Sequence, residues 1–327
     1  MYDGTLGVIG AIEAVRALRE SGFSPRRSIS VVMFTSEEPT RFGLSCIGSR
    51  LLVGALQTKA LDDLKDASGV SFHEARNQAG YEGDISTVRL DAQSFSAFVE
   101  LHIEQADVLE TTGVNIGAVT HIAAPAAAEV TFEGSGGHAG SWLMKYRNDA
   151  GLAGAQLALA VERIALDRGD DCVATTGKFE VFPGAINSVP KIARLGIDVR
   201  DVNLERRDSA LQDIEKEMMQ IATLRNVTAN FMVNNRDDPA ACDGRVVNAV
   251  IEEAAELNLS FSQMVSRAYH DALFMAKQFP TGMIFVPCRK GVSHRPDEFV
   301  DEHDIHNGVA VLAGVLVRLA GEEKTEL

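Results

Sequence analysis

Residues 28–39 (SISVVMFTSEEP) and 96–105 (SAFVELHIEQ) decide how the rest of the chain is interpreted. Each stretch is a short apolar run that stops at polar residues, which is typical of a buried parallel strand. The first run ends at the carboxylates of Glu37 and Glu38, and the second ends at His102. In open α/β sheets, sites form at the carboxyl ends of such strands. We therefore predict an α/β fold with candidate ligands at two strand ends.

Helical patterns surround these two runs. Residues 5–22 carry apolar side chains at helical spacing and end at a glycine, so they predict a helix that follows Asp3. Further helices are predicted at residues 51–58, 71–81, 244–258, 270–278 and 304–319, with a strand at residues 282–288. This alternation predicts an α/β/α catalytic domain formed by residues 1–120 and 236–327.

A second domain interrupts the first. From residue 126 the predicted order is strand, helix, strand, strand, helix and strand. These elements cover residues 126–134, 149–166, 175–183, 194–202, 205–224 and 226–234. The order is the split βαβ pattern of a ferredoxin-like layer. We therefore expect an inserted βαββαβ domain at residues 121–235.

The charge of the chain argues against nucleic acid and membranes as partners. It has 31 Lys and Arg residues against 46 Asp and Glu residues, and this net charge of -15 repels both. No apolar run approaches the roughly 18 residues of a membrane helix. The four cysteines form no CxxC pair, so we expect buried free thiols. A small-molecule substrate is expected, and the cellular compartment stays open.

Four candidate metal ligands lie at the ends of predicted elements: Asp3, Glu38, His102 and His294. Each has an ordinary structural explanation, since an aspartate can cap a helix, an acidic pair can be a solvated turn, and a histidine can lie in a core or loop. As a set, oxygen and imidazole ligands suit zinc or manganese. Because adjacent side chains diverge, one of Glu37 and Glu38 could bind an ion while the other faces a metal-held water.

The order of motifs along the chain resembles a family of metallo-amidohydrolases. These motifs are YDGTLGV, FTSEEPTRFG, LHIEQ, GSGGHAG, AINSVP, DVRD and GVSHRPDE. The family includes N-carbamoyl-L-amino-acid amidases, allantoate amidohydrolases and ureidoglycolate amidohydrolases, and the resemblance spans essentially the whole chain. FTSEEPTRFGLSCIGSRLL and SRAYHDALFMA are most similar to the ureidoglycolate members. The resemblance implies a two-domain dinuclear metallohydrolase whose inserted domain serves dimerisation and acts as a lid.

The resemblance assigns roles to the candidate ligands. It implies two divalent ions per subunit, Mn²⁺ in first place and Zn²⁺ in second, with Asp3 as the bridging carboxylate. Glu38, His102 and His294 are then ligands of the individual ions, and Glu37 is the general base. A metal-bound water has its pKa lowered to about 7, so a nearby carboxylate can take its proton and pass it to the leaving nitrogen.

The resemblance also implies substrate contacts and a partner. His138 is expected to stabilise the developing oxyanion in the active site of a second copy of the chain, which implies a homodimer. Arg200 with Asn187 is expected to bind the substrate carboxylate, because a guanidinium fork suits that group. Further polar contacts with the substrate are expected from Gln105, Tyr269 and His270.

The implied reaction is hydrolysis of the ureido amide of (S)-ureidoglycolate to ammonia, carbon dioxide and hydroxyglycine or glyoxylate, in purine catabolism through allantoin. Allantoate and N-carbamoyl-L-amino acids are alternative substrates, because the members that act on them share the metal ligands. An alternative of another class is a non-catalytic binding protein that has lost its metal site. Family members carry an upstream segment with one more ligand histidine, so we expect a chain truncated at its N-terminus. Retention of Glu37 favours an enzyme.

Overall fold

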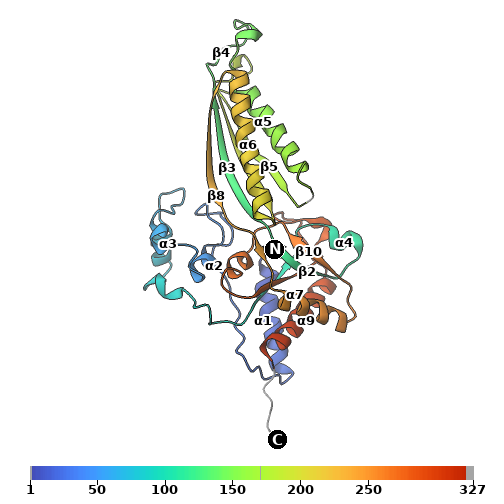
Figure 1. Cartoon of the computed structure of the whole chain (residues 1–327). Coiled ribbons are helices and arrows are strands. Elements are labelled where there is room, and N and C mark those ends of the chain that lie inside the picture. Colours follow the sequence, from blue (N-terminus) through green and yellow to red (C-terminus); the bar gives the residue numbers. More distant parts are fainter. Residues whose placement is uncertain (1, 170, 322–327) are drawn as a thin grey trace. The chain divides into compact units, whose positions relative to one another are not determined.

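The computed structural model describes residues 2–169 and 171–321, and these form two compact units. Unit 1 combines Met1–Ile122 with Ala240–Leu327, and unit 2 is Ala123–Pro239. The colours of Figure 1 show this insertion, since the blue and red ends of the chain share one unit while the green and yellow middle forms the other.

Unit 1 contains a mixed sheet in the order β1-β11-β2-β10, and the short strand β9 pairs with β2. The strands are β1 (Phe98–Ile103), β11 (Thr281–Val286), β2 (Ile116–Ile122), β10 (Phe261–Ser266) and β9 (Ala240–Ala241). β1 runs parallel to β11, and β2 runs parallel to β10, but β11 and β2 are antiparallel. Most of β2 and all of β11 are buried, as expected for the centre of a covered sheet.

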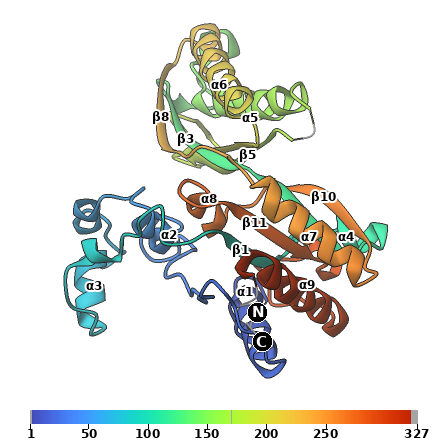
Figure 2. The ribbon, with the colours of Figure 1, turned by 60° about the horizontal axis from the view of Figure 1, so that its bottom comes forward.

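Three helices cover one face of this sheet: α1 (Thr5–Glu20), α7 (Gly244–Glu256) and α9 (Glu302–Ala320). They lie side by side in Figure 2, and their apolar side chains share a core with Leu101 and Ile103 of β1. Successive side chains of a strand point to opposite faces, so Glu100 and His102 point to the other face. Alternation along β1 thus separates the apolar core from the polar side chains of the sheet.

Short helices lie on that second face and in the connections. α2 (Ile47–Leu52) contacts α8 (Asp271–Met275), and α8 contacts β1 and β11. α3 (Phe72–Gln78) begins with a capping box. α4 (Val108–Thr112) follows β1. Single 3₁₀ turns are found at Thr58–Asp62 (η1), Ile85–Val88 (η2), Met144–Tyr146 (η3) and Arg289–Gly291 (η4).

The sequence predicted most elements of unit 1, with two corrections. Residues 28–39 form no strand in the described chain, because an extended segment becomes a strand only when its backbone pairs with a neighbour. The predicted helix 51–58 is also wrong, since α2 begins at Ile47 and ends at Leu52, before Gly54, whose φ is 72°. Strands β2 and β10 were not predicted. α1, β1, β11, α3, α7, α8 and α9 confirm the other predictions within a few residues.

Unit 2 has the predicted βαββαβ order. Its antiparallel sheet runs in the order β5-β7-β3-β8, and two helices accompany it. The elements are β3 (Ala124–Glu133), α5 (Ala150–Leu166), β5 (Val173–Phe182), β7 (Ile192–Asp201), α6 (Leu204–Arg225) and β8 (Thr228–Arg236). A separate two-stranded sheet joins β4 (Gly137–His138) to β6 (Ser188–Val189). This strand order places β7 and β3 at the centre, as in a ferredoxin-like layer.

The core of unit 2 lies between its helices and one face of its sheet. Phe132, Leu157 and Ile214 are fully buried there.

Of the cysteines, Cys46, Cys172 and Cys288 are buried and Cys242 is half-buried, and all are free, as expected. None of the helices within the described ranges has the length and apolar character needed to cross a membrane.

Candidate metal centre

The structure brings the four predicted ligands together in unit 1 as a chain of contacts. Asp3 lies between two histidines, with its Oδ1 3.1 Å from His102 Nε2 and its Oδ2 3.4 Å from His294 Nε2. The same His294 nitrogen lies 3.0 Å from Oε1 of Glu38. One carboxylate oxygen faces each imidazole, which is the arrangement a bridging carboxylate needs. Two carboxylates and two imidazoles form a donor set that suits a divalent transition metal.

Different elements deliver these side chains. Asp3 precedes α1, His102 is the penultimate residue of β1, and the other two lie in loops. Non-glycine residues around the site have positive φ angles, a conformation that costs about 1–3 kcal/mol per residue and is often found at functional sites. These residues are Ser36 (53°), Cys46 (57°), Gln105 (60°) and His294 (57°).

His102 is oriented for ligation by its second ring nitrogen. Its Nδ1 lies 2.8 Å from the carbonyl oxygen of Ile103, to which it donates, so Nε2 faces Asp3. Burial opposes a charge on His102, but the hydrogen bond that its ring donates to Asp3 and the charge of Glu100 outweigh burial and raise the pKa of His102 to about 9. Burial likewise raises the pKa of Asp3, but its hydrogen bonds, led by that with His102, hold this pKa well below its usual range.

Glu37 is held in place through its backbone. The N–H groups of residues 46–48 at the start of α2 donate to the carbonyl groups of residues 35–37, with lengths of 2.8, 3.1 and 3.1 Å. A Cβ atom at Gly48 would lie 2.9 Å from the Thr35 nitrogen, so this close approach requires glycine. The Glu37 side chain lies 3.7 Å from Cys46 Sγ. α2 therefore fixes the backbone from which the Glu37 side chain projects.

The surroundings of Glu37 suit proton transfer near neutral pH. Burial, followed by the charges of Asp271 and Glu38, raises the pKa of Glu37 to about 7. A general base is most effective when its pKa lies near the working pH. Glu37 therefore has the electrostatics of a base rather than those of a solvated turn.

A second polar cluster lies on the same face of the sheet. Among the described residues, Glu100, His102 and His270 form a group whose ligand atoms all lie within 4.8 Å of one another. His270 is 2% exposed, with its Nε2 2.7 Å from Ser266 Oγ and its Nδ1 3.6 Å from Glu100. Burial raises the pKa of Glu100 to about 8. The His270 ring packs against that of His102, with centroids 4.6 Å apart, and the expected contact of His270 with substrate stays a prediction.

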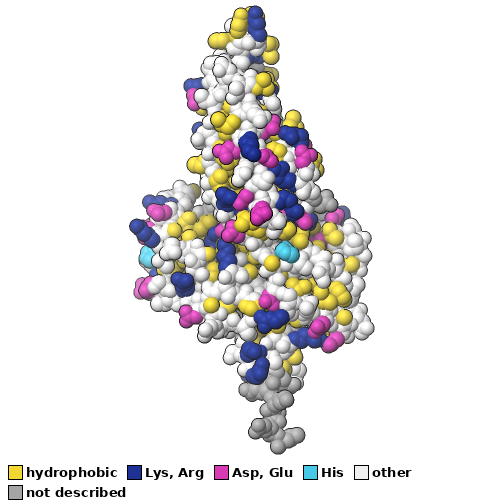
Figure 3. Space-filling model, in the orientation of Figure 1, with side chains coloured by type: hydrophobic (Ala, Val, Ile, Leu, Met, Phe, Trp, Pro, Cys, Tyr) yellow, Lys and Arg dark blue, Asp and Glu magenta, His cyan; other side chains and the backbone are white. Residues whose placement is uncertain are grey.

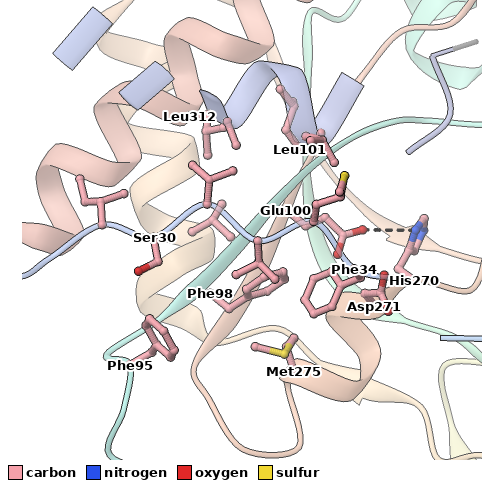
Figure 4. A pocket seen from close by; sticks show the side chains of 18 of the residues that line it. Ser30, Phe34, Phe95, Phe98, Glu100, Leu101, His270, Asp271, Met275 and Leu312 are labelled. Atoms are coloured by element: carbon pink, nitrogen blue, oxygen red, sulfur yellow. Dashed lines mark ion pairs between the residues drawn. The ribbon is translucent and has the colours of Figure 1, made fainter. Parts of the chain in front are cut away.

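Both clusters border a groove of about 1010 Å³ in unit 1. Figure 4 shows Glu100, His270 and Asp271 together at one end, and apolar side chains such as Phe34 and Phe98 beside them. Asp3, Glu37 and His102 also line the groove. The groove is therefore large enough for a small substrate and lined with candidate catalytic groups.

The other predicted contacts of unit 1 have defined partners. Gln105 Nε2 donates to Asp3 Oδ2 at 2.7 Å, while its buried Oε1 has no hydrogen-bond partner among the described residues. Tyr269 accepts a hydrogen bond of 2.6 Å from Arg50. Gln105 thus contacts the candidate metal ligand Asp3 through its amide nitrogen.

Unit 2 contains the remaining predicted residues. His138 is exposed, and its Nδ1 accepts from the Gly140 N–H at 3.1 Å, so its Nε2 carries the proton in the neutral ring. The carbonyl of Asn187 accepts from Ala139 at 2.9 Å, which places Asn187 next to His138. Arg200 lies near the C-terminal end of β7, and its Nε lies 2.8 Å from Oδ1 of Asp198.

Sequence reasoning missed several residues of the site. Asp271 accepts a hydrogen bond of 2.5 Å from Ser49, and Ser293 donates to Asp3 Oδ2. Glu298 accepts from the backbone of Asp3. Each is close in sequence to a predicted residue, and Glu100 shares the face of β1 with His102. The sequence offered two signals: closeness to a predicted residue, and the alternation of side chains along a strand. Neither indicates which polar side chain points into the site.

With this geometry in place, comparison with known proteins defines the class. The family model described as peptidase family M20/M25/M40 matches residues 1–318, and the chain belongs to this family. A relative from Arabidopsis thaliana, named ureidoglycolate hydrolase, is 51% identical over 98% of this chain and 69% of its own length. Two crystal structures of AtUAH, in complex with glyoxylate and with (S)-hydroxyglycine, are 50% identical. Each has a TM-score of 0.86 and covers 98% of this chain and 77% of that chain.

The family match confirms the expected metallo-amidohydrolase resemblance and the α/β fold. The chain is a hydrolase of carbon-nitrogen bonds in a family whose amidohydrolases depend on metal ions, and its described residues include a group able to hold one.

Proposed function

We propose that this chain hydrolyses the ureido amide of (S)-ureidoglycolate to ammonia, carbon dioxide and hydroxyglycine, which decomposes to glyoxylate. The observation that carries the proposal is the chain of contacts from His102 through Asp3 and His294 to Glu38, with Glu37 beside it. Support for the substrate comes from the 51% identical relative and from the AtUAH complexes with glyoxylate and hydroxyglycine.

The four ligands would hold two divalent ions per subunit, with Asp3 between them. Manganese is the first expectation and zinc the second. Bound there, the ions would lower the pKa of water and polarise the ureido carbonyl. His102 fits this role because its Nδ1 donates to the Ile103 carbonyl and leaves Nε2 for the ion.

Glu37 moves the proton. In its ionised form, it takes a proton from the attacking water and passes it to the nitrogen that leaves as ammonia. The water oxygen adds to the ureido carbonyl carbon, and the terminal carbon-nitrogen bond then breaks to release ammonia. The carbamate that remains loses carbon dioxide to leave hydroxyglycine, and no step changes an oxidation state. Gln105, Tyr269 and His270 would contact the substrate from unit 1, and His270 lines the groove beside His102.

Unit 2 supports the proposal of a homodimer. β7 runs from Ile192 to Asp201, so at about 3.3 Å per residue Arg200 and Ile192 lie roughly 26 Å apart. His138 lies in β4 and Asn187 directly precedes β6, the strand that pairs with β4, and the chain continues from Val189 of β6 to the start of β7 at Ile192. One small substrate cannot touch both ends of this strand. If Arg200 and His138 both serve one substrate, they come from two copies of the chain.

The surface near β4 fits such a contact. Figure 3 shows hydrophobic side chains at the end of unit 2 that carries β4. Leu143 and Met144 are 64% and 68% exposed, and Ile186 is fully exposed. Exposed apolar side chains gathered in one place often mark a protein interface. His138, with its proton on Nε2, could then donate to the developing oxyanion in the partner's site, while Asn187 and Arg200 bind the carboxylate.

The substrate is tested by comparing turnover of ureidoglycolate, allantoate and N-carbamoyl-L-amino acids by the Mn²⁺-loaded chain, with ammonia release as the readout. Ureidoglycolate should be preferred and should also yield glyoxylate. Preference for either other substrate would replace the proposed one while keeping the metal chemistry. Metal binding with no turnover of any of them would favour a binding protein.

The dimer is tested by mixing variants. His138→Ala and Arg200→Ala should each be inactive alone, but together they should recover about a quarter of the activity, because half of the dimers are mixed and each has one intact site. A mixture of His138→Ala with Asn187→Ala is the control, since these neighbours would enter the same site and should not complement. No recovery in the first mixture would contradict the shared site.

A further inference from the structure

The carboxylate of Glu298 is bonded to the backbone of the proposed bridging ligand. Its Oε1 accepts hydrogen bonds from the N–H of Tyr2 at 2.6 Å and of Asp3 at 2.9 Å. The side chain is only 6% exposed, so these bonds are shielded from water. Both bonds end on one oxygen atom, and their donors belong to consecutive residues. The pair therefore fixes the peptide unit from which the Asp3 side chain projects.

The residue after Glu298 is itself anchored. The Phe299 ring packs edge-on against Tyr2, with centroids 5.8 Å apart. The Phe299 carbonyl accepts from the Arg289 N–H at 2.9 Å, and the Arg289 guanidinium lies 4.0 Å from the Phe299 ring centroid. Glu298 thus reaches Asp3 from a segment that is fixed on two sides. Such support is what a residue needs in order to orient another.

The same loop holds Asp3 at its side chain as well. Ser293 donates to Asp3 Oδ2, and His294 Nε2 lies 3.4 Å from that oxygen. The cap of α1 does not supply this restraint, because Gly4 at that position makes no side-chain hydrogen bond. One stretch, GVSHRPDE, therefore contacts the side chain of Asp3 through its serine and histidine and the backbone through its glutamate.

We propose that Glu298 is a positioning residue for Asp3, fixing the carboxylate so that one oxygen faces His102 and the other faces His294. The inference rests on the proposed function in so far as Asp3 bridges two ions. The proposal makes a specific prediction. Displacing the bridging carboxylate would weaken the binding of both ions, whereas loss of an individual ligand such as Glu38 would weaken the binding of one. Removing a residue that orients a ligand typically lowers metal affinity about 10- to 100-fold.

The test is calorimetric titration of the metal-free 327-residue chain with Mn²⁺, without substrate. Glu298→Gln keeps an oxygen that can accept both bonds, so it should bind both ions within a few-fold of the unmodified chain. Glu298→Asp is one methylene too short, so both ions should bind about 10- to 100-fold more weakly. Asp297→Asn is the matched control: this exposed carboxylate pairs with Arg295, and its loss should leave both affinities unchanged.

Thermal unfolding of the same variants separates positioning from general stabilisation. A merely structural Glu298 would lower the unfolding temperature of Glu298→Asp and leave the affinity of the folded protein unchanged, which would overturn the proposal. Equally weak Mn²⁺ binding by Glu298→Gln and Glu298→Asp would also overturn the proposal. The charge of Glu298, rather than its two hydrogen bonds, would then determine the metal affinity. Weakening of only one ion would refute the bridge. Because no substrate is present, failure of ureidoglycolate turnover leaves these results intact.

Discussion

Arg50 of α2 and Tyr269, which lies two residues before α8, are joined by a hydrogen bond of 2.6 Å. The guanidinium of Arg50 also lies 4.1 Å from the ring centroid of Phe274, and Arg50 is 6% exposed. Ser49 and Asp271 join the same two helices at 2.5 Å. α2 fixes the backbone of Glu37, the proposed base. It is therefore also bonded to α8 and to Tyr269, a proposed substrate contact.

We predict that Arg50→Met raises the KM for ureidoglycolate, because the Tyr269 hydroxyl loses its buried donor. The effect should be about the same in Tyr269→Phe, and the two changes should not add. A double-mutant cycle on kcat/KM should give a coupling of about 0.5–3 kcal/mol, as for residues in direct contact. Fully additive effects would show that Arg50 does not orient Tyr269.

Glu37→Gln should strongly lower turnover while both ions remain bound. General-base catalysis contributes about 10²- to 10⁴-fold, so kcat should fall by that factor. Elemental analysis provides the decisive measurement, since a residue that moves protons can be replaced without loss of metal. Loss of the ions would make Glu37 a ligand instead.

The activity should also fall toward acid pH. Burial, together with the charges of Asp271 and Glu38, raises the pKa of Glu37 to about 7 in the metal-free chain, and bound cations would lower it. The ionised form is the active base, so kcat/KM should decline as the pH falls through this pKa. A pH profile that stays flat down to about pH 4, near the ordinary glutamate value, would contradict this role.

Replacing individual ligands should empty individual positions. Glu38→Ala and His102→Ala should each lose at least one ion per subunit, because every proposed ion has few protein ligands. Gln57→Ala, an exchange just outside α2 and away from the chain of contacts, should retain both ions. Full double occupancy in the two ligand variants would refute the ligand set.

Asp201 should stabilise unit 2 in a pH-dependent way. It is fully buried and accepts two hydrogen bonds of 2.6 Å from Arg206 and one of 2.8 Å from the Asn203 N–H. Burial raises the pKa of Asp201, but these bonds outweigh burial and lower it. Its stabilising effect is therefore complete above the unfolded value of about 3.9 and is lost as the pH falls toward the lower folded value.

Asp201→Asn should lower the free energy of unfolding by about 2–3 kcal/mol at pH 7, because bonds to a charged group are lost. The difference from the unmodified chain should shrink below about pH 4. Urea unfolding at both pH values measures this. Asp167→Asn is the control, since its carboxylate is 67% exposed and its contact with Arg163 is 3.9 Å long. An equal loss in both variants would contradict the assignment.

Periodicity was enough to predict the elements whose pattern is local. Residues 5–22 became α1, and the βαββαβ order of unit 2 appears as expected. Residues 28–39 did not form a strand, because pairing depends on a neighbour that the segment's own sequence does not specify. β2 was missed because its residues Gly117 and Ala118 have low strand propensity, although Gly117 leaves room for Met264 and Phe285.

The candidate site was predictable where the residue type is itself a common metal ligand. Asp3, Glu38, His102 and His294 converge as their placement at element ends indicated. Residues that act through others could not be found in this way. Ser49, Ser293 and Glu298 are ordinary polar residues in sequence, and only the fold shows which of their atoms reach a buried partner.

The bonds from Glu298 to Tyr2 and Asp3 join positions 296 and 295 residues apart, and this separation constrains the order of events during synthesis. As the ribosome adds residues from the N-terminus, unit 2 is complete at Pro239 and can fold as soon as it emerges. Unit 1 must wait for β11 and the loop that follows it. Asp3 is made 295 residues before Glu298 and is thus held by its partner only late in synthesis, and until then α1 is exposed to chaperones and proteases. Metal incorporation should consequently be a late, post-translational step.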